Sequence, residues 1–67
     1  MNIKISDYPQ LFLIAWNRDR NGFMDEQDAF HLYESHWRFV DIENLSLFEK
    51  DFIDRLTKIY GNGVFHP

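Results

Sequence analysis

The stretch from residue 17 to residue 28 carries the residue types and spacing that could do chemistry. Counted from Asn17 as position 1, side-chain oxygen donors fall at positions 1, 3, 5, 9 and 12, and Gly22 occupies position 6. Carboxylate and amide oxygens arranged around a sharp turn suit a hard divalent cation such as Ca²⁺ or Mg²⁺. This spacing makes the stretch the first candidate for a chemical site.

The same stretch resembles the EF-hand, a helix, twelve-residue loop and helix that bind calcium, over residues 8 to about 37. Apolar residues flank and enter the loop where that family keeps them: Leu13, Trp16, Met24, Ala29, Leu32 and Tyr33. The resemblance implies side-chain oxygen ligands, a backbone carbonyl at position 7 and, at position 9, an oxygen or a bound water. The implied ligands are Asn17, Asp19, Asn21, Phe23, Asp25 and Asp28.

The sequence departs from the EF-hand pattern at both ends of the loop. Asn17 stands where the family has aspartate, Asp28 stands where it has the longer glutamate, and Arg18 and Arg20 add two positive charges. These departures imply an affinity of about 10⁻⁴ to 10⁻³ M or weaker, and the shorter Asp28 favours Mg²⁺.

The loop residues also fit a turn that binds no metal. Asn21 and Gly22 tolerate positive φ and can form the turn, while acidic residues from Asp25 onward suit the positive end of a helix dipole. Arg18 and Arg20 would then pair with those acids or lie in solvent. Both interpretations stay open at the level of sequence.

Three helices are expected to position this loop. The first is predicted from Tyr8 to Trp16, with Asp7 as N-cap and Gln10 three residues later. The second is predicted from near Asp25. Its buried stripe, with residues that widen it, is Phe30, Tyr33, Trp37 and Val40, then Ala29, Leu32 and Phe39. Residues 41–44 are predicted to form the second connection.

The third helix is predicted from Ser46 to Tyr60, ending at Gly61. Ser46 and Glu49 fit a capping box, and the inward stripe is predicted to be Phe48, Phe52, Leu56 and Ile59, with charged residues including Glu49 on the opposite face. The apolar pairs near the termini, Ile3 with Ile5 and Val64 with Phe65, suggest a short strand pair between the two ends. The predicted fold class is therefore all-α, a single three-helix domain over residues 1–67.

Composition limits the functional classes. The chain has 67 residues, no cysteine and a net charge of −4, from 11 acidic and 7 basic residues. An acidic surface repels phosphate backbones, which disfavours nucleic-acid binding, and the absence of cysteine excludes disulfides and thiol nucleophiles. The longest apolar run, residues 11–16, is far shorter than the roughly 20 residues of a membrane span. We expect a cytoplasmic protein with no membrane contact.

No pattern for catalysis emerges from the remaining residues. His31 and His36 are five residues apart, which turns them about 140° from one another around a helix. No phosphate loop or serine elbow is present, so we expect no enzyme. The twelve aromatic residues carry more apolar surface than three short helices readily bury, which suggests that some of the rings form an exposed patch for a partner.

We therefore expect a small acidic protein-protein interaction domain, such as an inhibitor or an antitoxin-like protein, whose partner is another protein. No cofactor is expected, and the sequence leaves the oligomeric state undetermined. The alternative is a divergent single EF-hand that binds Ca²⁺ or Mg²⁺ weakly.

Overall fold

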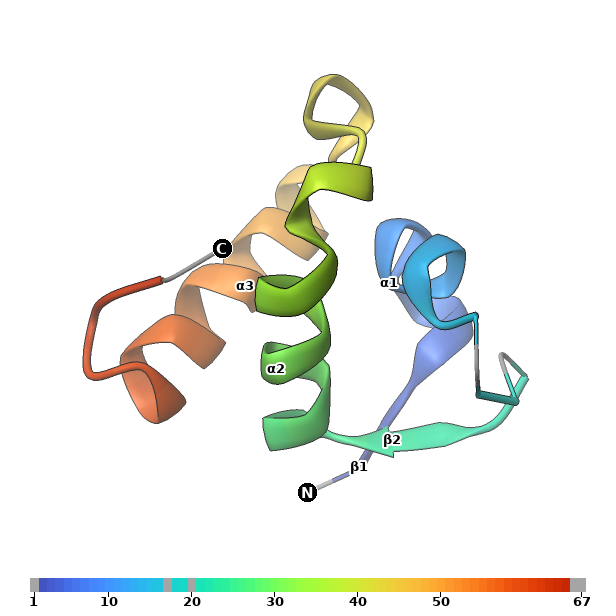
Figure 1. The fold of residues 1–67 in the computed structure, drawn as a ribbon, viewed down its shortest axis with the longest axis horizontal. Helices are drawn as coiled ribbons and strands as arrows, with labels where there is room; N and C mark the ends of the chain where they lie inside the picture. The colour runs from blue at the N-terminus through green and yellow to red at the C-terminus, as the bar shows by residue number, and fades with distance from the viewer. Residues whose placement is uncertain (1, 17, 20, 66–67) are drawn as a thin grey trace.

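A computed structural model of the chain describes residues 2–16, 18–19 and 21–65. Within these residues the chain forms three α-helices: α1 (Pro9–Ile14), α2 (Glu26–His36) and α3 (Leu47–Tyr60). Short 3₁₀ helices occupy Ile5–Asp7, Trp37–Phe39 and Ile42–Asn44. In Figure 1, α2 stands in the middle, with α1 on one side and α3 on the other. The prediction of three helices is confirmed, but the fold is not purely helical.

A two-stranded antiparallel sheet lies at the end of the molecule where α2 begins (Figure 1). Strand β1 (Asn2–Lys4) pairs with β2 (Phe23–Asp25), and Ile3 lies opposite Met24. The predicted pairing of the two termini is therefore wrong. The C-terminal segment packs instead through Phe65, whose ring contacts Phe30 and Trp37.

The first helix begins differently from the prediction. Asp7 ends a 3₁₀ helix, and the N-cap residue of α1 is Tyr8, whose side chain caps nothing. The capping group comes from α3, because the carboxylate of Glu49 accepts the backbone N–H groups of Gln10 (3.0 Å) and Leu11 (2.9 Å). It also accepts the hydroxyl of Tyr33 in α2 at 2.7 Å. A single buried carboxylate thus connects all three α-helices.

The buried face of α3 is rotated from the predicted one. Ser46 is the N-cap as predicted, accepting the Glu49 N–H at 3.1 Å. However, Phe48 is 64% exposed and Ile59 is 55% exposed, so the prediction that they face the core is wrong. The buried residues of α3 are Glu49, Phe52, Ile53 and Leu56. This set follows helical spacing but includes a charged residue.

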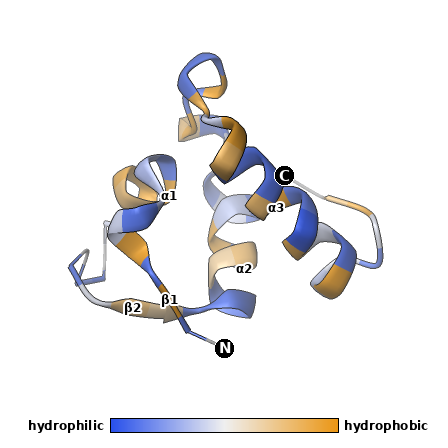
Figure 2. Cartoon of the chain, turned by 180° about the vertical axis from the view of Figure 1, so that it is seen from behind, coloured by the Kyte–Doolittle hydropathy of each residue, from blue (hydrophilic) through white to orange (hydrophobic). Residues whose placement is uncertain are grey.

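The other helices supply the rest of the core. α1 ends at Ile14 rather than at Trp16, and Phe39 lies half exposed in a 3₁₀ helix instead of widening the buried stripe of α2. Figure 2 shows hydrophobic and hydrophilic residues along α3, which accords with a helix that has one buried face. The core contains Ile5, Tyr8, Leu11, Ile14, Ala15, Met24, Ala29, Phe30, Tyr33, Val40, Phe52, Ile53 and Leu56. In the described part of the chain, no helix has the length and apolar character needed to cross a membrane.

Candidate functional site

The predicted cation loop is organised by local hydrogen bonds. Asp19 accepts the Asn21 N–H on its side chain (3.1 Å) and the Gly22 N–H on its backbone carbonyl (2.9 Å), which closes a turn. Asp25 is the N-cap of α2, and its carboxylate accepts the Gln27 N–H at 3.1 Å. This local chemistry explains why the chain turns here and why α2 starts at residue 26.

Asp28, the third described aspartate of the predicted site, does not join the carboxylates of Asp19 and Asp25 in one cluster. Asp28 lies 3.9 Å from the guanidinium of Arg18, Phe23 is exposed in β2, and Asn17 falls outside the described residues. Over residues 2–16, 18–19 and 21–65, no three His, Cys, Asp or Glu side chains converge as a metal-ligand group. The three described aspartates each already have a partner within the protein.

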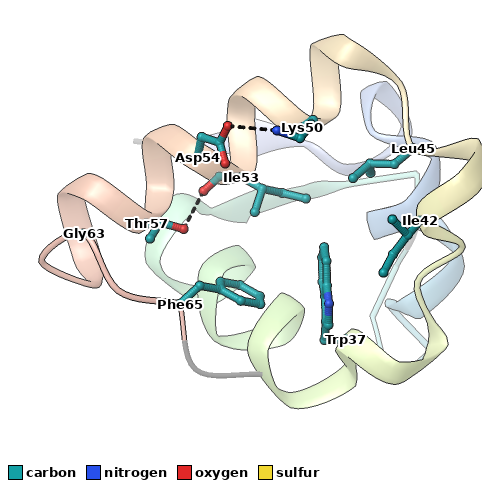
Figure 3. A pocket seen from close by; sticks show the side chains of 9 residues that line it. All are labelled: Trp37, Ile42, Leu45, Lys50, Ile53, Asp54, Thr57, Gly63 and Phe65. Carbon is teal, nitrogen blue, oxygen red and sulfur yellow. Dashed lines mark hydrogen bonds and ion pairs between the residues drawn. The ribbon is translucent and has the colours of Figure 1, made fainter.

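An apolar cavity of about 280 Å³ lies between α3, the 3₁₀ segments after α2 and the C-terminal segment. Its residues are Trp37, Ile42, Leu45, Lys50, Ile53, Asp54, Thr57, Gly63 and Phe65. In Figure 3, Trp37, Ile42 and Phe65 surround the central space, and Ile53 reaches into it from α3. This cavity falls just below the roughly 300 to 1,000 Å³ of typical small-molecule sites.

The polar side chains that α3 contributes to the cavity have partners within the helix. Lys50 lies 3.6 Å from the carboxylate of Asp54, and both side chains are exposed at the rim (Figure 3). The Thr57 hydroxyl donates a hydrogen bond to the carbonyl of Ile53, one turn earlier, at 2.8 Å. Chemically, the space is suited to receive an apolar group rather than to activate a reacting atom.

A second, shallower hollow continues the cavity along the outer side of α3. It is lined by Leu47, Lys50, Asp51 and Asp54, so it shares Lys50 and Asp54 with the cavity. Leu47 is 85% exposed, although full burial of a leucine side chain stabilises a protein by about 1.5 to 3 kcal/mol. We call the two hollows together the α3 groove.

An aromatic cluster joins the end of α1 to the end of α2. The Trp16 ring lies 5.0 Å from the His36 ring and 4.9 Å from the Phe39 ring, measured between centroids. Among the described residues, the buried Nδ1 atom of His36 has no hydrogen-bond partner. Because that atom is out of reach of solvent, a ligand could contact it only after the ring moved. We therefore assign the cluster to packing.

The ionisable group most perturbed by its surroundings is structural. Burial, followed by the nearby charge and hydrogen bond of Glu49, raises the pKa of the Tyr33 phenol above its ordinary value of 10. Tyr33 and Glu49 are both fully buried, so no substrate can reach either group. Their role is to hold the helices together.

The sequence prediction missed the residues that form the α3 groove. Ile42 lies in a segment interpreted as a connection, and Phe65 was assigned to a strand pair. One signal was present: Ile42 is an isolated apolar residue between Asp41 and Glu43. An isoleucine in an acidic connection stabilises the fold only if its side chain packs on a neighbouring element, away from water. Nothing local in the sequence identified that element as α3.

No protein-family model, curated protein or solved structure matches the chain. A functional proposal must therefore come from its own surface.

Proposed function

We propose that this chain is a non-enzymatic protein-protein interaction domain, of the kind that serves as a small inhibitor or antitoxin-like binding protein. The observation that carries the proposal is the exposure of two consecutive apolar residues at the start of α3: Leu47, which lines the hollow beside the apolar cavity, and Phe48. Contiguous exposed apolar surface on a small protein marks an interaction site, because leaving it in water forfeits stabilisation. A bound partner would recover that stabilisation.

Two features support binding rather than catalysis. The polar side chains that α3 contributes to the cavity, Lys50, Asp54 and Thr57, are engaged in an ion pair or a backbone hydrogen bond. The strongest carboxylate network, at Glu49, is sealed in the core, where it contacts α1 and α2. Catalysis needs a positioned acid, base or nucleophile that a substrate can reach, and neither location supplies one.

Affinity capture from the native host tests this proposal. The tagged chain is compared with a Leu47→Ser/Phe48→Ser variant, and captured proteins are quantified by mass spectrometry. We expect one protein at near-equal molar amounts with the natural chain and at least about tenfold less with the variant, since central apolar contacts dominate binding energy. Equal capture by both chains, or no protein at stoichiometric amounts with either, would contradict the proposal.

An alternative proposal is weak Ca²⁺ or Mg²⁺ binding by the 17–28 loop. One observation favours it. The backbone N–H of Ile5 donates a hydrogen bond to the Gly22 carbonyl, and along an antiparallel ladder hydrogen-bonded residue pairs alternate with pairs that are not hydrogen-bonded. The Lys4 and Phe23 pair is consequently a non-bonded one, and the ladder does not use the Phe23 carbonyl that a cation would need. A calcium titration followed by NMR tests this alternative. The absence of any shift of the Gly22 amide at millimolar metal would end it.

A further inference from the structure

The α3 groove combines an apolar floor with a negatively charged border. Asp51 and Asp54 line it from α3. The opposing charge among the lining residues is Lys50, which already pairs with Asp54. Two carboxylates and one ammonium group thus line the groove, which leaves it with an excess of one negative charge.

We infer that the α3 groove binds a basic amphipathic segment of a partner protein. This inference rests on the proposed function and names the surface and the chemistry of the partner. One large apolar side chain of the segment occupies the cavity beside Trp37 and Phe65. Lysine or arginine side chains on either side of that anchor pair with Asp51 and Asp54, because complementary charge steers association and fixes the register.

The size of the cavity supports a single anchoring side chain. At about 280 Å³ it lies just under the volume of a typical small-molecule site, and its floor is formed by aromatic and branched aliphatic residues. The neighbouring hollow exposes Leu47 along the same helix, which gives the partner a second apolar contact farther along α3. Two apolar contacts along one helix match a partner that presents apolar residues on one face.

The charge distribution argues against a second copy of this chain as the occupant. A two-fold symmetric dimer places the same surface of both copies in contact. The two copies would then bring the same net negative surface together, and like charges across an interface are unfavourable. A basic segment from a different protein meets the same surface without that penalty.

A peptide titration tests the inference with Trp37 as the reporter. The Trp16→Phe variant leaves Trp37, which lines the cavity, as the single tryptophan. The probes are two amphipathic peptides of about four helical turns, one built from leucine and lysine and the other from leucine and glutamate. We expect the lysine peptide to shift Trp37 emission to shorter wavelength and to bind at least about tenfold more tightly than the glutamate peptide at low salt. Raising the salt to about 0.5 M should weaken the lysine peptide at least about fivefold.

Charge reversals inside and outside the groove locate the binding site. Asp51→Lys/Asp54→Lys should weaken the lysine peptide at least about tenfold, whereas the control Asp7→Lys, on an exposed residue outside the groove, should change the affinity less than about twofold. Asp51→Asn/Asp54→Asn is the milder pair if the reversal unfolds the chain, as judged by circular dichroism. Equal binding of both peptides, an unchanged Trp37 signal, or equal effects of the groove and control variants would overturn the inference.

The same variants separate this inference from the proposed function. A stoichiometric host partner whose capture is unaffected by the Asp51 and Asp54 substitutions would overturn the groove assignment and leave the interaction function standing. Absence of any host partner would contradict the proposed function, whatever the peptides do.

Discussion

Replacing Glu49 with glutamine is the sharpest test of what holds this small fold together. The carboxylate is completely buried and accepts three hydrogen bonds, from Gln10 N–H and Leu11 N–H in α1 and from the Tyr33 hydroxyl in α2. A glutamine side chain has nearly the same shape, but only one of its two terminal atoms can accept. Its NH₂ group must therefore face at least one donor, which becomes a buried, unsatisfied group.

The expected cost follows from those contacts. A hydrogen bond to a charged group contributes about 1.5 to 3 kcal/mol, and a buried donor left unsatisfied costs about 1 to 3 kcal/mol. We therefore expect Glu49→Gln to lower the free energy of unfolding by about 2 to 4 kcal/mol. Domains of this length have a total stability of about 3 to 10 kcal/mol, so the variant loses a large part of it. The corresponding drop in Tm is about 10 to 25 °C.

Urea denaturation followed by circular dichroism measures the effect. Glu43→Gln is the matched control, because Glu43 is exposed and its substitution should change the free energy of unfolding by less than about 0.5 kcal/mol. Tyr33→Phe removes one donor and should cost less than Glu49→Gln. The double variant should show non-additivity of at least about 0.5 kcal/mol, because the two residues are in direct contact. If Glu49→Gln were as neutral as Glu43→Gln, the assignment of Glu49 as the cap that joins the helices would be refuted.

Three further predictions follow from the structure. Because the folded pKa of Tyr33 is raised, its contribution to stability is complete below the unfolded value near pH 10. That contribution is lost as the pH rises toward the folded pKa, at up to about 1.4 kcal/mol per pH unit. Alkaline urea titrations should therefore show a smaller loss of stability for Tyr33→Phe than for the natural chain, and an identical slope would contradict this. Gly61→Ala should destabilise the chain more than Gly63→Ala in thermal melts, since its new Cβ would lie 2.4 Å from the Val64 carbonyl and 2.8 Å from the Phe30 ring. At Gly63 (φ +85°) space is open, and only backbone strain of about 1 to 3 kcal/mol applies. The reverse order would show that the close contacts at Gly61 relax freely. If the 17–28 loop binds Ca²⁺, Arg18→Gln should tighten binding about threefold to tenfold in an NMR titration. The substitution removes a nearby positive charge and frees Asp28 from its ion pair. An unchanged affinity would show that Arg18 does not oppose the cation.

Local chemistry in the sequence was enough to predict the helix starts that depend on adjacent residues. Ser46 is the N-cap of α3, and α2 begins next to Asp25, as the sequence indicated. In each case the capping oxygen and the N–H group that it accepts lie within three residues of one another. Such contacts form whatever the rest of the chain does, which is why sequence patterns detect them.

The start of α1 could not be predicted in this way. Its cap, Glu49, is 38 and 39 residues from the N–H groups that it accepts. Glu49 also matched a local capping box with Ser46, so the sequence favoured a solvent-facing carboxylate. The error in the buried face of α3 has the same origin: placing Glu49 inside turns Phe48 and Ile59 outward.

The sheet and the groove depend on contacts between distant segments as well. The alternation of Ile3 and Ile5 with polar residues indicated a strand near the N-terminus. Two short apolar segments, residues 23–24 and residues 64–65, were available to pair with it. The loop segment forms the strand partner, and Phe65 packs on Phe30 and Trp37. The groove then arises where Phe65, Ile42 and α3 meet, a combination that no single sequence window contains.

The most direct test of the central claim, that a partner protein binds at the α3 groove, is photo-crosslinking in the native host. A photoreactive amino acid replaces Leu47, which is 85% exposed in the groove, or, as a control, Asp7, which is exposed outside it. We expect one protein to be cross-linked from position 47 and not from position 7. A chain that cross-links to no protein from position 47, or to the same proteins from both positions, would contradict the claim.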